Sequence, residues 1–204
     1  MHAVLERQTY RPSPPLLRWR TTGRAELDAL SEARRAVAGG GAARRLAAQQ
    51  VTHALVVQLA AQFQRFCRDL HSECSNVVVA AAPAAYQYVL DELLISGRKL
   101  DHLSAQPASL GSDFARFGLD LWSSVDQLDP RHRDRRRRLT QVVIWRNAIA
   151  HQDLRRASAD PLTASTAVDP ATVALWRRAL DQLAGGLDRA MWAQLGTIVG
   201  RPPW

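Results

Sequence analysis

The sequence has few of the features that a secreted or membrane-inserted protein needs. Only two cysteines, Cys67 and Cys74, occur among its 204 residues. Both fall on one predicted helix, where a rise of about 1.5 Å per residue places their Cα atoms too far apart for a disulfide. No apolar run approaches the roughly 18 residues of a membrane span, and residues 1–20 lack the apolar core of a signal peptide. We therefore expect a cytoplasmic protein that does not enter a membrane.

Lysine is almost absent from the chain. Lys99 is the only lysine among 27 Lys and Arg residues, which face 19 Asp and Glu residues. The resulting formal net charge of +8 favours a polyanionic partner. An arginine- and alanine-rich composition also follows from GC-rich coding DNA, so the charge supports nucleic-acid binding without deciding it.

The sequence also lacks a phosphate-binding loop and a convincing set of metal ligands. The glycine run at 39–41 has neither the strand nor the lysine that a phosphate-cradling loop needs. Cys67, His71 and Cys74 share one face of a predicted helix, but they continue its apolar row, so small core thiols are the simpler interpretation. We expect no metal and no cofactor.

The pattern of apolar residues predicts an all-α protein, a bundle of five to six helices with no credible strand. An extended Pro/Arg-rich segment (residues 1–22) precedes one helical domain (residues 23–204). The best-defined helix spans about 42–71, where Val56, Leu59, Phe63, Phe66 and Leu70 repeat at spacings of three and four. The other helices are predicted at about 24–38, 84–95, 114–128, 130–151 and 170–191.

Helix starts and connections are also predicted from individual residues. Asp129 and Asp169 are each followed by a proline, which suits an N-cap residue and the first helical position. A loop of about fifteen residues is expected before Phe114. A second linker, rich in Ser, Thr, Pro and Asp, is expected over residues 158–169.

Arg146, Asn147 and His151 form the most informative cluster in the sequence. They lie near the C-terminal end of the helix that is predicted to start at Pro130. Arg146 occupies a position where the helical spacing calls for a core-facing aliphatic residue, in the row Leu139, Val142 or Val143, Arg146, Ile149 or Ala150. A guanidinium in such a place needs a partner or a function.

Arg146 and His151 do not point the same way on an ideal helix. They are about 140° apart at 3.6 residues per turn, whereas Asn147 lies one turn before His151 and can orient its ring. Either the helix frays at His151, or two copies meet across a two-fold axis and share one groove. The second arrangement predicts a homodimer whose interface buries the apolar neighbours Val143, Trp145 or Ile149.

Arginine and histidine without a carboxylate pair suit chemistry on RNA phosphates. An imidazole can take the proton of a ribose 2′-OH or return one to the leaving 5′-oxygen, and a guanidinium can stabilise the charge that builds on the phosphoryl oxygens. DNA lacks the 2′-OH and would be bound but not cut. The arginines expected to guide the RNA backbone are Arg131, Arg133, Arg135, Arg136, Arg137, Arg138, Arg155 and Arg156.

The Arg-Asn-x-x-x-His arrangement, late on a helix of an all-α bundle, resembles the HEPN superfamily of prokaryotic ribonucleases and toxins. The resemblance covers about residues 24–195. It implies a metal-independent endoribonuclease that works as a dimer, with Arg146 and His151 catalytic and Asn147 supporting. It also implies a role as a toxin or anti-phage effector that a cognate antitoxin or regulatory protein controls. Members silenced by a nucleotidyltransferase-type antitoxin carry Tyr two residues after the His, and Asp153 in that position argues against this mode of silencing.

Other interpretations of the same residues stay open. Arg146 and His151 near a helix C-terminus can be partners of the helix dipole or of Asp153, and the arginine run can be a solvated helix face. The chain would then be a non-catalytic module that binds RNA or a nucleotide, or a dimerisation domain.

Overall fold

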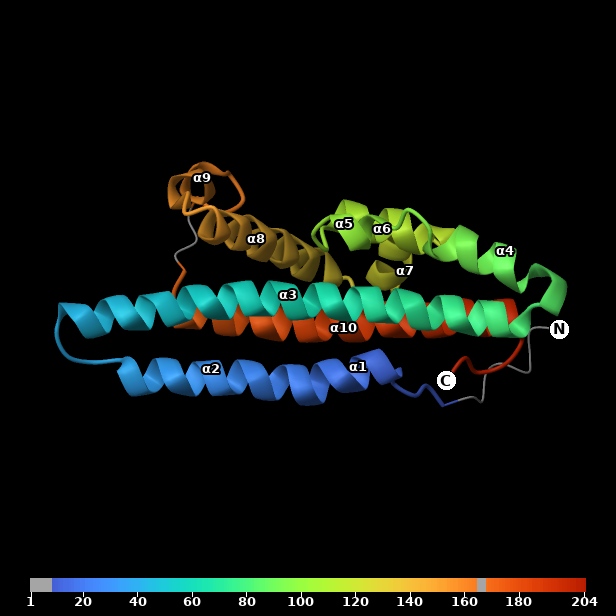
Figure 1. The fold of residues 1–204 in the computed structure, drawn as a ribbon, viewed down its shortest axis with the longest axis horizontal. Coiled ribbons are helices and arrows are strands. Elements are labelled where there is room, and N and C mark those ends of the chain that lie inside the picture. The colour runs from blue at the N-terminus through green and yellow to red at the C-terminus, as the bar shows by residue number, and fades with distance from the viewer. Residues whose placement is uncertain (1–8, 165–167) are drawn as a thin grey trace.

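Two long helices form the centre of the molecule. The computed structural model describes residues 9–164 and 168–204, and all regular secondary structure in these ranges is helical, which confirms the all-α prediction. Helices α3 (Ala42–Ala81) and α10 (Pro170–Val199) lie side by side and run in the same direction (Figure 1). The N-terminal helices pack on one side of this pair, and the segment from α4 to α9 lies on the other.

The predicted seam of α3 is confirmed. Val56, Leu59, Phe63 and Leu70 are fully buried, and Phe66 is 3% exposed. The helix continues to Ala81, about ten residues beyond the predicted end. It ends there because the residue before Pro83 is driven away from helical angles, and Ala82 has a ψ of 153°. The side chains of the α3 seam meet the buried leucines of α10 to form the core.

The N-terminal segment is helical where an extended chain was predicted. Residues 1–8 lie outside the described part, but α1 (Pro14–Arg18), a π-helical turn (Trp19–Gly23) and α2 (Arg24–Val37) follow one another. Ser13 caps α1 and, with Tyr10, donates hydrogen bonds to the buried carboxylate of Asp188 on α10. Burial raises the pKa of that carboxyl. The prediction for residues 14–22 was wrong because this partner lies far away in the sequence.

The single helix predicted over residues 114–128 is two helices. Gly118 has a φ of 74° and interrupts the helical conformation between a 3-10 turn (Ala115–Phe117) and α7 (Leu121–Leu128). The Asp120 side chain caps α7 by accepting hydrogen bonds from two backbone N–H groups. The loop of about fifteen residues that was expected before Phe114 contains α5 (Lys99–His102) and α6 (Pro107–Phe114).

Helices α8 and α10 start near the predicted places. Asp169 caps α10 with Pro170 in the first turn, as predicted. Asp129 instead binds the backbone N–H of Arg131, and α8 (His132–Ala150) starts after that turn. The predicted linker over 158–169 begins within α9 (Leu154–Ala159), and residues 165–167 lie outside the described part.

The short helices change the count. The described residues form more helical segments than the five to six predicted, because α5, α6, α7 and α9 are too short to show a clear apolar period. Helix α4 (Ala84–Ile95) was predicted. None of the helices in the described ranges has the length and apolarity to cross a membrane.

A buried imidazole joins α3 to the segment that contains α5 and α6. His71 is fully buried, its Nε2 lies 3.2 Å from the backbone oxygen of Asp113, and Nη1 of Arg98 lies 3.5 Å from Nδ1. Nε2 therefore donates and Nδ1 faces a cation, so the ring is neutral. Burial and the charge of Arg98 lower the pKa of His71 to about 4.

We predict that protonation of His71 destabilises the fold as the pH falls from about 6.5 to about 4. In this window the unfolded chain binds a proton that the folded chain does not. This group therefore lowers the free energy of unfolding by about 1.4 kcal/mol per pH unit, and stability is regained as the pH rises. Urea unfolding across the window measures the effect. His71→Gln should flatten the pH dependence, whereas His102→Gln, at an exposed position, should not; equal slopes for all three proteins would contradict the assignment.

Candidate active site

Helix α8 carries Arg146 and Asn147 and ends just before His151. Arg146 and Asn147 are half-buried, and His151 is exposed. The predicted buried row is thus only partly right, because Arg146 lies at the edge of the core-facing side and not within it. The buried positions of the C-terminal two-thirds of α8 are Leu139, Val142, Val143, Trp145 and Ala148.

The Arg146 side chain lies in a narrow crevice between α8 and α3. The crevice is lined by Ala60, Phe63 and Gln64 of α3 and by Ser104 and Ala105 of the loop after α5, together with two apolar residues of α8. The guanidinium Nη1 donates a hydrogen bond to Oδ1 of Asn147 at 2.9 Å. This is its only hydrogen bond within the described residues. Most of its N–H donors therefore have no protein partner there and can bind an anion.

Asn147 supports the arginine more directly than the histidine. Its side-chain oxygen accepts the hydrogen bond from Arg146. Between Asn147 and His151 the described residues show one bond, from the backbone N–H of His151 to the backbone oxygen of Asn147 at 3.0 Å. The structure thus gives Asn147 a positioning contact with the guanidinium, and none with the imidazole ring.

His151 lies at a well-defined helix end. The N–H of Gln152 donates to the oxygen of Ile149 at 3.2 Å, and the N–H of Asp153 donates to the oxygen of Ala148 at 2.9 Å. These two bonds make a Schellman motif, which requires left-handed backbone angles at Gln152, where φ is 56°. These hydrogen bonds fix the backbone around His151, and its imidazole is exposed to solvent.

The two candidate catalytic side chains leave α8 in different directions. His151 keeps near-helical backbone angles (φ −93°, ψ 1°), so the helix does not fray before it and the separation of about 140° from Arg146 still applies. Val143 and Trp145 are 5% and 7% exposed and belong to the core of the chain itself, which removes them from the predicted interface. Ile149 is only partly buried and is the predicted interface residue that a second copy can reach.

The arginines at the start of α8 are held by nearby carboxylates. Asp129 pairs with Arg131 at 3.0 Å and with Arg135 at 2.8 Å. Arg135 is 8% exposed and also donates to Gln182 of α10 at 2.8 Å, with the ring of His132 against its guanidinium. These arginines lower the pKa of the Asp129 carboxyl. Arg135 therefore joins the turn before α8 to α10, whereas, among the described residues, Arg131 pairs only within that turn.

The next arginines bind α7 to α8. Asp126 of α7 pairs with Arg133 at 3.1 Å and with Arg136 at 3.6 Å, and the Arg136 guanidinium lies 5.1 Å from the centre of the Trp122 ring. The arginine run had suggested an RNA guide, and the sequence pattern gave no sign that the two carboxylates before it, Asp126 and Asp129, would engage it. The ion pairs of these carboxylates form only when α7 and the turn before α8 pack against α8.

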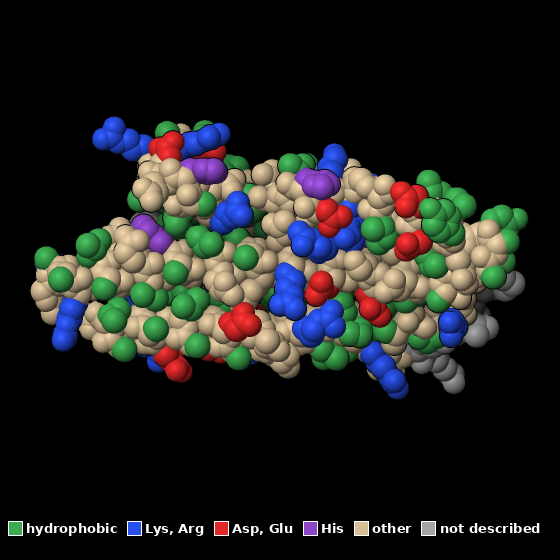
Figure 2. Space-filling view, viewed as in Figure 1, with side chains coloured by type: hydrophobic (Ala, Val, Ile, Leu, Met, Phe, Trp, Pro, Cys, Tyr) green, Lys and Arg blue, Asp and Glu red, His purple; other side chains and the backbone are tan. Residues whose placement is uncertain are grey.

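The remaining arginines of the predicted RNA path make no ion pair with a described residue outside α8. Arg138 pairs within α8 with Asp134 at 2.8 Å. Arg137 is exposed, and so are Arg155 and Arg156 on α9, the helix that follows His151. Figure 2 shows Lys and Arg side chains near a histidine at this end of the molecule, over α8 and α9. The path therefore divides into arginines that pair with Asp126 or Asp129 and arginines that have no such partner among the described residues.

Cys67 and Cys74 are fully buried in the core, which confirms the core-thiol interpretation. Burial raises the pKa of both thiols. His71, between them on α3, is used by the contacts with Asp113 and Arg98. Within the described ranges, no group of three or more His, Cys, Asp or Glu side chains is placed to hold a metal ion.

Comparison of the chain with protein-family models, with curated proteins and with solved structures finds no match in any of the three. Function is therefore inferred from the residues themselves and from their positions in the fold. Arg146 is half-buried and has N–H donors without a partner among the described residues, and His151 is exposed at a helix end whose backbone is hydrogen-bonded.

We predict that Gln152→Gly raises the free energy of unfolding by about 1 kcal/mol. Glycine adopts the left-handed angles of this position without the cost that a side chain carries there. For a chain of this size such a gain raises Tm by about 2–4 °C. Differential scanning calorimetry measures it, with Gln152→Ala as the matched control that keeps the cost. A glycine variant no more stable than the alanine variant would show that the Schellman turn is not strained.

Proposed function

We propose that this protein is a HEPN-type, metal-independent endoribonuclease that acts as a homodimer. The observation that carries the proposal is the guanidinium and the imidazole at the end of α8, which differ in their burial. Arg146 is half-buried with unused N–H donors, and His151 is exposed on a fixed backbone, within an Arg-Asn-x-x-x-His arrangement. A toxin or anti-phage effector in the cytoplasm, controlled by a cognate antitoxin or regulatory protein, is the corresponding biological role.

The proposed reaction needs one proton acceptor and one charge stabiliser. A neutral His151 takes the proton of the ribose 2′-OH, and O2′ attacks the phosphorus. The bond from phosphorus to O5′ breaks, and the leaving oxygen receives a proton from an imidazolium. The products are a 2′,3′-cyclic phosphate and a 5′-hydroxyl. Arg146 donates hydrogen bonds to the phosphoryl oxygens as negative charge builds on them, while Asn147 holds the guanidinium.

A two-fold dimer can bring together an arginine and a histidine that point in different directions within one chain. The angle between Arg146 and His151 keeps them from closing on one phosphate within one copy. When two α8 ends meet, the arginine of one copy can face the histidine of the other, and two imidazoles are available as base and acid. Ile149, between the two residues on α8 and partly exposed, lies where such a contact would bury it.

A second function is favoured by the Arg146–Asn147 hydrogen bond. This bond prepares an anion site without involving His151, which is what a module that binds RNA or a nucleotide without cutting it requires. The two functions differ in their dependence on the imidazole. Cleavage requires it, whereas binding does not.

We predict that Arg146→Ala and His151→Ala each reduce RNA cleavage about 10²-fold or more, because they remove the charge stabiliser and the proton carrier. The measurement is the cleavage of mixed RNA by purified protein in the presence of EDTA, with detection of 2′,3′-cyclic phosphate ends. Arg146→Lys is the matched variant: it keeps the charge but loses the fork of donors, so partial activity is expected.

Two results would count against this mechanism. Parental cleavage rates in both alanine variants would show that the site lies elsewhere. RNA binding without cleavage under every condition, unchanged in His151→Ala, would establish the binding module. Arg44→Ala, at an exposed position of α3 outside the predicted RNA path, is the control for loss of one positive charge.

We predict that Ile149→Asp dissociates the dimer and abolishes cleavage together, because it buries an unpaired carboxylate in the two-fold contact. Analytical ultracentrifugation beside the cleavage assay measures both effects. Ile149 also touches the core, so circular dichroism must show that the helices are retained. Ala150→Asp, at an exposed neighbouring position, tests the same surface without this risk. A folded monomer with full activity would show that each chain carries a complete site.

A further inference from the structure

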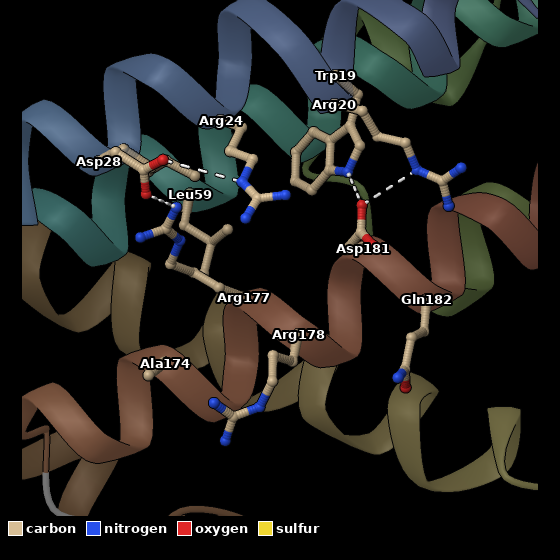
Figure 3. Close-up of a pocket in the computed structure, with 11 residues that line it drawn as sticks. Trp19, Arg20, Arg24, Asp28, Leu59, Ala174, Arg177, Arg178, Asp181 and Gln182 are labelled. Carbon is tan, nitrogen blue, oxygen red and sulfur yellow. Dashed lines mark hydrogen bonds and ion pairs between the residues drawn. The ribbon is translucent and has the colours of Figure 1, made fainter.

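A recess with a volume of about 340 Å³ lies between α2 and α10, away from the α8–α3 crevice (Figure 3). Its inner residues are buried and apolar: Trp19, Leu27 and Leu59. Its polar wall is dominated by arginine, with Arg20 and Arg24 on the N-terminal side and Arg177 and Arg178 on α10. No sequence pattern links these arginines, because they come from segments about 150 positions apart in the chain.

The carboxylates in this recess neutralise only part of its charge. Asp28 pairs with Arg177 at 2.6 Å and more loosely with Arg24 at 3.8 Å. Asp181 pairs with Arg20 at 3.3 Å and accepts a hydrogen bond from the Trp19 indole at 3.2 Å. Arg178 is exposed and has no ion pair or hydrogen bond to any residue in the described ranges. Four arginines thus face two aspartates.

A second recess of about 550 Å³ continues the first along α10 and shares Arg20 and Gln182 with it. Among the described residues it adds Arg131, Arg135 and Arg189 and one carboxylate, Asp129. We call the two recesses together the α10 groove; the described residues that line it include seven arginines and three aspartates. The groove follows α10 from Ala174 to Arg189, a length of about 22 Å at 1.5 Å per residue.

Two glycines in the middle of α10 open the junction of the two recesses. A Cβ at Gly185 would lie 3.0 Å from the Arg20 guanidinium, and a Cβ at Gly186 would lie 2.5 Å from the His132 ring. Glycine within a helix costs about 1 kcal/mol relative to alanine, so a consecutive pair is unfavourable for the helix alone. At this place Gly185 leaves room for the Arg20 guanidinium, which lines both recesses, and Gly186 leaves room for the His132 ring.

We propose that the α10 groove binds the sugar–phosphate backbone of a single-stranded nucleic acid. Its positive charge extends over several helical turns, which suits a chain of phosphates better than one small anion. Arg146 and His151 line neither recess, so this binding site is separate from the proposed cleavage site and does not depend on cleavage.

Binding of a labelled oligothymidylate, measured by fluorescence anisotropy over a series of salt concentrations, tests the proposal. This probe has the same phosphate backbone but no 2′-OH, so it survives the measurement. Arg24→Glu and Arg178→Glu should each weaken binding about tenfold at low salt and reduce the salt dependence of log Kd by about 0.7 or more. Arg44→Glu makes the same charge change at an exposed position outside the groove, and it should have little effect. Circular dichroism checks the fold of each variant.

Two outcomes would overturn the proposal. Equal weakening by Arg44→Glu would show that only the overall charge matters. Competition by tripolyphosphate, at equal phosphate concentration, as effective as competition by the unlabelled oligomer would show a site for a small anion. RNA cleavage is assayed in parallel to separate the two proposals. Oligomer binding without cleavage leaves the groove in place and counts against the ribonuclease, whereas cleavage with unaltered binding in both groove variants counts against the groove alone.

Discussion

The parallel packing of α3 on α10 is the contact on which the rest of the molecule depends. Fully buried side chains from both helices, among them Leu59 and Phe63 of α3 and Leu180 and Leu183 of α10, meet along this contact. Helix α8 packs against both members of the pair, and α2 packs against α3. The end of α8 and the arginines along α10 therefore owe their positions to one apolar seam, because neither surface has a core of its own.

The parts of the fold that were predictable from sequence are those fixed by neighbouring residues. The α3 seam shows a helical period, and the start of α10 is marked by Asp169 and the proline after it, so both signals are local. The N-terminal helix was missed because Ser13 needs Asp188, which is 175 positions away. No local pattern contains such a contact.

The candidate site was predictable to a similar degree. The residue types and spacing of Arg146, Asn147 and His151 suggested their chemistry, but the Arg146–Asn147 bond and the exposure of His151 required coordinates. The role of the arginine run was harder to predict, because some arginines of this protein form ion pairs within the fold and others face solvent. Arg133 and Arg136 hold α7 against α8, whereas arginines scattered through the sequence converge on α10. The composition gives the number of arginines, but only the packed structure shows which of them can reach a ligand.

The position of α10 has a consequence for how the chain is made. Helix α10 follows α1 to α9 in the chain, and Ser13, which caps α1, donates a hydrogen bond to Asp188 near the end of α10. Until residues 170–199 leave the ribosome, α3 has no partner for much of its apolar seam, and α8 lacks one of its two supports. Native contacts of such long range form late. A nascent chain therefore lacks an assembled α8 surface until α10 has been synthesised.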